Sequence, residues 1–321
     1  MRIELLGSLA IRYHGVLATP TARKPRTVLA LLAARAARTV ELDELVEELW
    51  ASRVPRSART TVQTYVLQLR RLLATAISKS GFSPSRADSE AKRLLETCPG
   101  GYVLNVAPEE VDVWHFERLA AEGHRARETG DPQLAATRFA EALGWWRGSP
   151  LSGVPTGRHL REVARRWEEM RLNVLDRRID ADLLLGRHHE LVGELTALVL
   201  RHPRHEGLCA HLMVALYRSG RSCEALEVYR RLRAGLSDES GIEPSPQLRR
   251  LHRSMLVPDR AREDMGGPGR RAVPVGGRST EPATARGRGD LPERISAETA
   301  ALPWDAHGRI SGTRPAPSGL P

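Results

Sequence analysis

The stretch RTTVQTYVLQLRRLL, residues 59–73, decides how the first third of this 321-residue chain folds. Its apolar side chains recur every three or four residues, which predicts an amphipathic helix whose buried face consists of Val62, Val66, Leu69 and Leu73. The opposite face, at about 100° per residue, carries Thr60, Thr64, Leu67 and Arg71, with Gln63 and Gln68 on its flanks. A solvated helix usually fills its outer face with Glu and Lys, and this stretch contains neither.

The outer face of this helix is suited to reading DNA. Thr and Gln side chains donate and accept hydrogen bonds at base edges, and a Thr methyl or a Leu side chain fits against a thymine methyl. Arg side chains suit phosphates or guanine, whereas a carboxylate would be repelled by DNA. The alternative is a neutral, solvated helix. We predict DNA contacts from Arg59, Thr60, Gln63, Thr64, Leu67, Gln68 and Arg71.

The positive charge of the chain is concentrated around this helix. The whole sequence has 49 basic and 39 acidic residues, a net charge of +10. Residues 1–107 hold 16 basic and 9 acidic side chains, whereas residues 108–256 hold 23 and 22. A coding bias toward Arg over Lys does not explain why acidic residues are scarce in one region only. The distribution indicates that the first region binds a polyanion.

The segments around the helix predict a winged-helix domain over residues 1–107. The expected elements, in order, are two short strands within 2–18, helices over 25–37, 42–50 and 59–73, and a hairpin over 94–106. Ser57 is a suitable N-cap for the third helix, and Pro99-Gly100-Gly101 supplies the hairpin turn. The polar segment 78–92 is interpreted as a long loop. In this order of elements, the third helix enters the major groove.

Residues 108–256 predict only helices. Three segments align on a glycine, GDPQLAATRFAEAL (130–143), GRHHELVGEL (186–195) and GRSCEALEVY (220–229), and the last two are 34 residues apart. This spacing is typical of tetratricopeptide-type helix pairs, which bury their faces by stacking. In the alignment, small or apolar Ala135, Leu191 and Ala225 correspond, as do large Phe139, Leu195 and Tyr229. We predict a tetratricopeptide-like domain, so that the chain is mainly α-helical.

The remainder of the chain and the cysteines complete the prediction. Residues 257–321 are rich in Gly, Pro, Arg, Ser and Thr without periodicity, which predicts a disordered C-terminal tail. The three cysteines have no metal-ligand spacing, and no apolar signal stretch opens the chain. No apolar run is long enough to span a membrane. We therefore expect a reduced, cytoplasmic protein with free thiols.

The chain resembles a known family of transcription regulators. IELLGSLAIRYHG (3–15), ELDELVEELW (41–50), ARTTVQTYVLQLRRLL (58–73) and CPGGYVLNV (98–106) are similar to the OmpR-type DNA-binding domain. The form is that of the Streptomyces antibiotic regulatory protein family. VDVWHFERL (111–119), the segment 176–233 and DESGIEPSPQLRRLHRSML (238–256) resemble that family's bacterial transcriptional activation domain. The resemblance runs over residues 1–256 in continuous order.

The resemblance implies a pathway-specific activator of antibiotic biosynthetic genes. Such a protein binds tandem direct repeats in double-stranded promoter DNA and recruits RNA polymerase. Because a single winged helix contacts few base pairs, we expect a homodimer on DNA. It also implies that the wing lies beside DNA, with backbone contacts near Gly100, Gly101 and Tyr102. Arg23, Lys24 and Arg26, before the first helix, suit a phosphate, and the alternative there is a solvated loop.

The chain departs from the family pattern at two places. Cys98 stands in the wing turn where members often have Arg, and Leu67-Gln68 stands where they often have Ser-Arg. The second difference predicts an altered base preference.

Other functions were weighed on the same residues. The histidines between His188 and His211 do not have the spacing of a known zinc finger. No nucleophile elbow, Gly-rich phosphate loop or metal triad occurs, so no enzyme, cofactor or metal is predicted. Trp145-Trp146 favours packing over an exposed binding patch. The rival function is a helical-repeat scaffold whose basic N-terminal domain binds another acidic partner. The acid-free outer face of 59–73 favours DNA, because a protein-binding face more often carries an aromatic anchor.

Overall fold

The structure, a computed structural model, describes residues 1–256. The expected disordered tail, 257–321, lies outside the described residues. The chain divides into two compact units, residues 1–181 and, within the described part, residues 182–256. None of the helices in residues 1–256 is both long and apolar enough to cross a bilayer.

A three-stranded antiparallel sheet opens the first unit. It consists of β1 (Arg2–Glu4), β2 (Ala10–Tyr13) and β3 (Val16–Leu17) in that order. Ile3 pairs with Ile11 and both are fully buried, because alternate residues of a strand point to the same side of the sheet. The third strand is an addition to the two that were expected.

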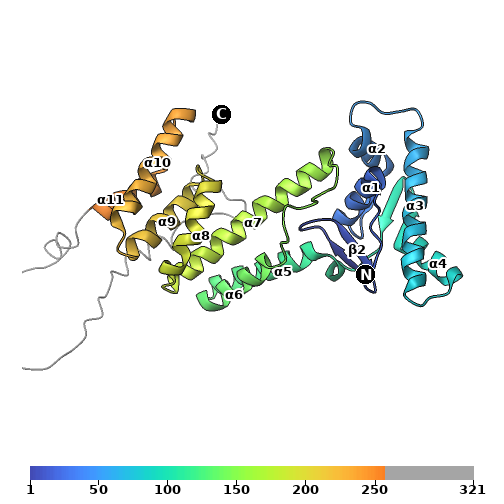
Figure 1. The fold of residues 1–321 in the computed structure, drawn as a ribbon, viewed down its shortest axis with the longest axis horizontal. Coiled ribbons are helices and arrows are strands. Elements are labelled where there is room, and N and C mark those ends of the chain that lie inside the picture. The colour runs from blue at the N-terminus through green and yellow to red at the C-terminus, as the bar shows by residue number, and fades with distance from the viewer. Residues whose placement is uncertain (257–321) are drawn as a thin grey trace, which may run out of the picture. The chain divides into compact units, whose positions relative to one another are not determined.

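Three helices follow the sheet, in the predicted order: α1 (Arg23–Ala34), α2 (Leu42–Trp50) and α3 (Ala58–Lys79) (Figure 1). A capping box between Glu41 and Glu44 starts α2 immediately after a strand. Burial alone would raise the pKa of Glu44, but hydrogen bonds from Arg35 and from the Glu41 N–H lower it below its ordinary value. Ser57 is the N-cap residue of α3, although its side chain makes no capping hydrogen bond.

The interpretation of residues 78–92 as a loop is wrong. Helix α3 continues to Lys79, and a fourth helix, α4 (Pro84–Leu94), packs against it. The polar composition of this segment concealed three apolar residues at helical spacing. Ala87, Ala91 and Leu94 are all buried, and Pro84 occupies the first helical turn, where its missing N–H costs little.

The predicted hairpin is present and carries a third strand. The sheet consists of β4 (Thr39–Glu41), β6 (Gly101–Leu104) and β5 (Leu95–Cys98), in that spatial order. Cys98 pairs with Gly101, so Pro99 and Gly100 form the turn, and Gly100 has a φ of +82°. This hairpin is called the wing below.

Residues 108–181 are attached to the N-terminal sheet. They contain a short 3-10 turn and three helices: η1 (Pro108–Glu110), α5 (Asp112–Glu128), α6 (Pro132–Leu143) and most of α7 (Arg158–Leu184). The buried Asp112 carboxylate accepts hydrogen bonds from the N–H groups of Leu5 and Leu6, at 2.9 and 3.0 Å, and lies 2.5 Å from Arg147. These long-range bonds join residues 108–181 to the N-terminal sheet, and the first compact unit ends at Ala181. The expected domain boundary at 107/108 stays a prediction.

The second unit contains the helices α8 (His188–Arg201), α9 (Glu206–Arg218), α10 (Ser222–Ser240) and α11 (Pro246–Leu256). The two aligned apolar positions are buried in all three copies of the repeat: Ala135, Leu191 and Ala225 at the first, and Phe139, Leu195 and Tyr229 at the second. The two adjacent tryptophans of the first unit pack against other rings. Trp146 packs edge-on against Phe116, as expected, and Trp145 stacks on His115.

Candidate nucleic-acid interface

Helix α3 buries one face and exposes the other, as its sequence predicted. Val62, Val66, Leu69 and Leu73 are at most 2% exposed. The side chains that were expected to contact DNA are all exposed: Arg59, Thr60, Gln63, Thr64, Leu67, Gln68 and Arg71. The two faces follow directly from the helical period, since both sets of residues recur at three- and four-residue spacing.

The exposed face has unused hydrogen-bonding capacity. The Thr64 hydroxyl donates to the Thr60 carbonyl oxygen at 3.0 Å, which leaves its oxygen free to accept. Gln63 and Gln68 have no hydrogen-bond partner among residues 1–256, so both amides can donate and accept. Leu67 is 47% exposed between them. This combination of amides, hydroxyls and one apolar side chain fits the major-groove edges of base pairs.

The two arginines on this face have different surroundings. Arg59 forms an ion pair with Asp43 of α2, with 2.7 Å between Nη2 and Oδ1. Arg71 forms no ion pair within the part of the chain that the structure describes. Arg71 therefore presents an uncompensated positive charge, whereas Arg59 is held by an acid that the sequence prediction did not connect with it.

A cleft of about 550 Å³ lies beside the N-terminal half of α3. Arg59 and Gln63 line one side of it, the start of α2 with Asp43 lines another, and the wing from Thr97 to Tyr102 closes it. The helix and the wing therefore border one continuous hollow.

The three wing residues that were expected to contact DNA expose little side-chain surface. Gly100 is exposed at the turn, whereas Gly101 and Tyr102 are buried. A Cβ on Gly101 would lie 2.1 Å from the Val40 carbonyl oxygen, because β6 passes close to β4 there. Tyr102 is 6% exposed and pairs with Val40 and Thr97 in the sheet. The structure does not bring the Tyr102 side chain to the surface, so its expected DNA contact is not supported.

The cations at the start of α1 also separate into two groups. Arg23 and Lys24 are exposed, and the Lys24 ammonium lies 4.5 Å from the centre of the Trp50 ring. Arg26 is half-buried and donates to the Leu9 carbonyl oxygen at 3.3 Å. Arg26 therefore serves the contact between α1 and the first sheet, and it does not join Arg23 and Lys24 at the surface.

Arg70 joins α3 to the wing. Its guanidinium donates to the Leu95 carbonyl oxygen at 2.8 Å and to the Thr97 hydroxyl at 2.7 Å. Its partners in β5 are therefore a carbonyl oxygen and a hydroxyl oxygen rather than a carboxylate. The two bonds hold the wing beside the helix.

Two further cations were not singled out from the sequence. Arg53 and Arg56 are exposed in the segment that leads into α3. Their position within four residues of the helix N-cap was the available signal, since the free N–H groups of a helix N-terminus attract a phosphate and nearby cations add to that attraction. Among residues 1–256, no cluster of three or more His, Cys, Asp or Glu side chains has the arrangement of a metal site.

Comparisons with known proteins agree with this geometry. Residues 18–82 match the family "Transcriptional regulatory protein, C terminal", and residues 111–256 match the family "Bacterial transcriptional activator domain". Regulatory protein DnrI of Streptomyces peucetius is 47% identical over 259 residues, which are 81% of this chain and 93% of DnrI. Transcriptional regulator RedD of Streptomyces coelicolor is 36% identical, over 81% of this chain and 71% of RedD.

A solved structure is also similar. It is Mycobacterium tuberculosis EmbR in complex with a low-affinity phosphopeptide, with a TM-score of 0.72 and 31% sequence identity. The match covers 79% of this chain and 64% of that one, so this chain spans just under two thirds of the EmbR chain.

Proposed function

This chain belongs to the Streptomyces antibiotic regulatory protein family of transcriptional activators, and on that premise we propose that it binds tandem direct repeats in promoter DNA through α3 and recruits RNA polymerase. The genes it controls are those of a secondary-metabolite pathway. The observation that carries the DNA-binding part of the proposal is the exposed, acid-free face of α3 opposite a fully buried face.

The N-terminal half of α3 reads base edges from the major groove. Thr60, Gln63, Thr64, Leu67 and Gln68 supply the hydrogen bonds and the apolar contact that distinguish base pairs. Arg71, and Arg59 after it leaves Asp43, neutralise phosphates. The wing turn at Gly100 approaches the backbone beside the helix.

Two copies act together on the promoter. One winged helix contacts few base pairs, so specificity requires two half-sites about one helical turn apart. The helical residues 108–256, which match the activator-domain family almost throughout, supply the contacts to RNA polymerase.

The test is a footprint of the full chain on the upstream region of its target genes. The full chain is preferred over the fragment 1–107, because removing residues 108–181 would leave the buried Glu48 and the Leu5 and Leu6 N–H groups without partners. We expect protection of two direct repeats, with two chains per protected site. In a transcription reaction that contains RNA polymerase holoenzyme, adding the chain should increase the amount of transcript. Binding without preference over random DNA would overturn the proposal.

A further inference from the structure

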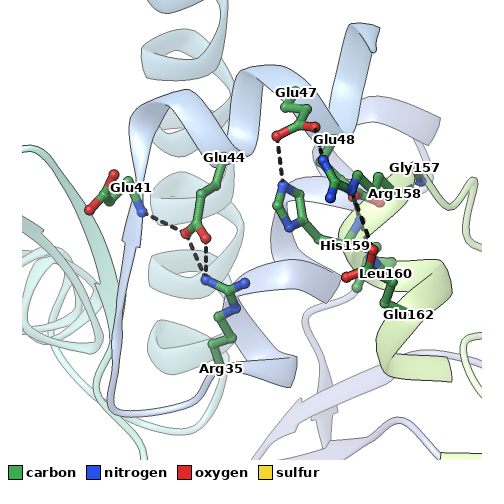
Figure 2. A network of polar contacts seen from close by, with 10 residues as sticks. All are labelled: Arg35, Glu41, Glu44, Glu47, Glu48, Gly157, Arg158, His159, Leu160 and Glu162. Carbon is green, nitrogen blue, oxygen red and sulfur yellow. Dashed lines mark hydrogen bonds and ion pairs between the residues drawn. The ribbon is translucent and has the colours of Figure 1, made fainter. Parts of the chain in front are cut away.

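Glu48 of α2 is a buried carboxylate with an unusual set of partners. It is 5% exposed, and its oxygens accept hydrogen bonds from the backbone N–H groups of Gly157, His159 and Leu160 (Figure 2). The His159 and Leu160 bonds measure 2.8 and 3.3 Å. A buried carboxylate is costly unless such bonds satisfy it.

These N–H groups belong to the start of α7. The first N–H groups of a helix have no partner within the helix, and the helix dipole favours a negative charge there. A neighbouring Ser, Thr or Asp usually caps such an end. Here the cap is supplied by a residue of α2, 109 to 112 residues earlier in the chain.

The fit around Glu48 is close. A Cβ on Gly157 would lie 2.3 Å from the Glu48 carbonyl oxygen and 2.8 Å from its Cδ. Only glycine therefore allows the start of α7 to approach α2 this closely.

Two neighbouring contacts hold the same segment. Glu47 lies 3.1 Å from His159 Nε2 and accepts a hydrogen bond from Arg158 at 3.3 Å (Figure 2). These hydrogen bonds lower the pKa of Glu47, and the one with His159 has the larger effect. On α1, the Thr27 hydroxyl donates to the Pro155 carbonyl oxygen at 2.8 Å. Helices α1 and α2, which both pack against α3, therefore both form hydrogen bonds with residues 155–160.

We propose that Glu48 is a positioning residue that locks the start of α7 to α2, so that the DNA-reading helix and α7 move as one body. Helix α7 continues to Leu184 and so leads into the second unit. A rigid connection of this kind would hold any contact that α7 makes with a second bound chain at a fixed position relative to α3. The DNA part of this inference rests on the proposed function, whereas the lock itself does not.

Hydrogen exchange of the full-length protein tests the lock without DNA. In Glu48→Ala, we expect the amides of Gly157, His159 and Leu160 to exchange about tenfold faster or more, while the amides of Leu69 and Leu73 in α3 keep their protection. Glu162→Ala is the matched control, because Glu162 joins the same network only through the Arg158 side chain. Unchanged exchange at 157–160, or equally faster exchange in α3, would overturn the proposal.

Two further variants cover a failure of Glu48→Ala to fold. Glu48→Asp keeps the charge but withdraws it by one methylene, and Gly157→Ala pushes the start of α7 away while Glu48 remains. Both should show the same selective loss of protection at residues 157–160. If both variants keep their protection from exchange at residues 157–160, the lock is contradicted.

Binding to tandem repeats tests the consequence. For the wild type, inserting about 5 base pairs, half a helical turn, between the repeats should weaken binding about tenfold or more. In Glu48→Ala the affinity for one half-site should stay within about twofold, and the insertion penalty should largely disappear. A wild type that binds neither site would count against the proposed function alone, whereas an unchanged insertion penalty in Glu48→Ala would count against the lock.

Discussion

Arg59 and Asp43 form an ion pair at the edge of the cleft between α3 and the wing, with 2.7 Å between Nη2 and Oδ1. Both side chains are about two-thirds exposed, at 67% and 72%. Exposed pairs of this kind contribute about 0–1 kcal/mol. On the proposed function, Asp43 would compete with DNA for Arg59, but an ion pair this weak would not prevent Arg59 from moving to a phosphate.

Replacing Asp43 with Asn should raise the affinity for DNA of any sequence, because Arg59 is then free to bind a phosphate. The slope of log Kd against log salt concentration should steepen by up to about 0.9, the value for one phosphate. The measurement is a salt titration of binding to random DNA. Asp88→Asn is the control, since Asp88 is an exposed acid of α4 and its loss changes the net charge equally. An equal response of both variants would show that net charge alone is responsible.

Replacing Arg71 with Ala should weaken binding to all sequences and reduce the salt slope by about 0.9, since Arg71 is proposed to neutralise one phosphate. Fluorescence anisotropy at several salt concentrations measures both quantities. Arg125→Ala removes an exposed arginine from α5 and should leave the slope nearly unchanged. A slope that stays constant in Arg71→Ala would rule out the phosphate contact and leave a base contact.

Replacing Thr64 with Ala should change base preference rather than overall affinity, by about 1 kcal/mol or more at one position. A selection of bound sequences from a random pool measures this. Thr137→Ala on α6 is the matched control, because both hydroxyls are exposed and donate to the carbonyl oxygen four residues earlier. An unaltered preference would remove Thr64 from the residues that read DNA.

Replacing Gln68 with Arg should move the preference at one base pair from adenine toward guanine. Gln pairs with adenine N6 and N7, whereas Arg pairs with guanine O6 and N7, and each pairing is worth about 1–3 kcal/mol. Gln68 is exposed and has no hydrogen-bond partner in residues 1–256, so the exchange disturbs no internal contact. Competition between two oligonucleotides that differ at that position measures the shift. Equal changes for both oligonucleotides would assign Gln68 to the backbone.

Replacing Gly101 with Ala should destabilise the fold by about 1–3 kcal/mol, because the new methyl group collides with the Val40 carbonyl oxygen and separates β4 from β6. Thermal unfolding measures the loss. Gly193→Ala is the contrast, since Gly193 lies inside α8 with open space around it. That change should stabilise the protein by about 0.5–1 kcal/mol. A stable Gly101→Ala variant would show that the wing can separate from β4 without cost.

The sequence by itself determined the features that depend on local periodicity. The two faces of α3, the strands around Ile3 and Ile11, and the matched burial of Ala135, Leu191 and Ala225 all follow from spacing along the chain. The wing followed from two β-leaning runs joined by a Pro-Gly turn. Helix α4 was accessible to the same reasoning through Ala87, Ala91 and Leu94, but its polar composition concealed the pattern.

Tertiary structure alone decided which side chains meet. Arg59 pairs with Asp43, Arg26 donates to the Leu9 carbonyl oxygen, and the Tyr102 side chain is buried. The capping of α7 by Glu48 joins residues more than a hundred positions apart. No periodicity links such residues, because their proximity depends on how separate helices and strands pack. The exposed, acid-free face of α3 therefore follows from its own sequence, whereas the connection of α2 to α7 depends on the folded chain.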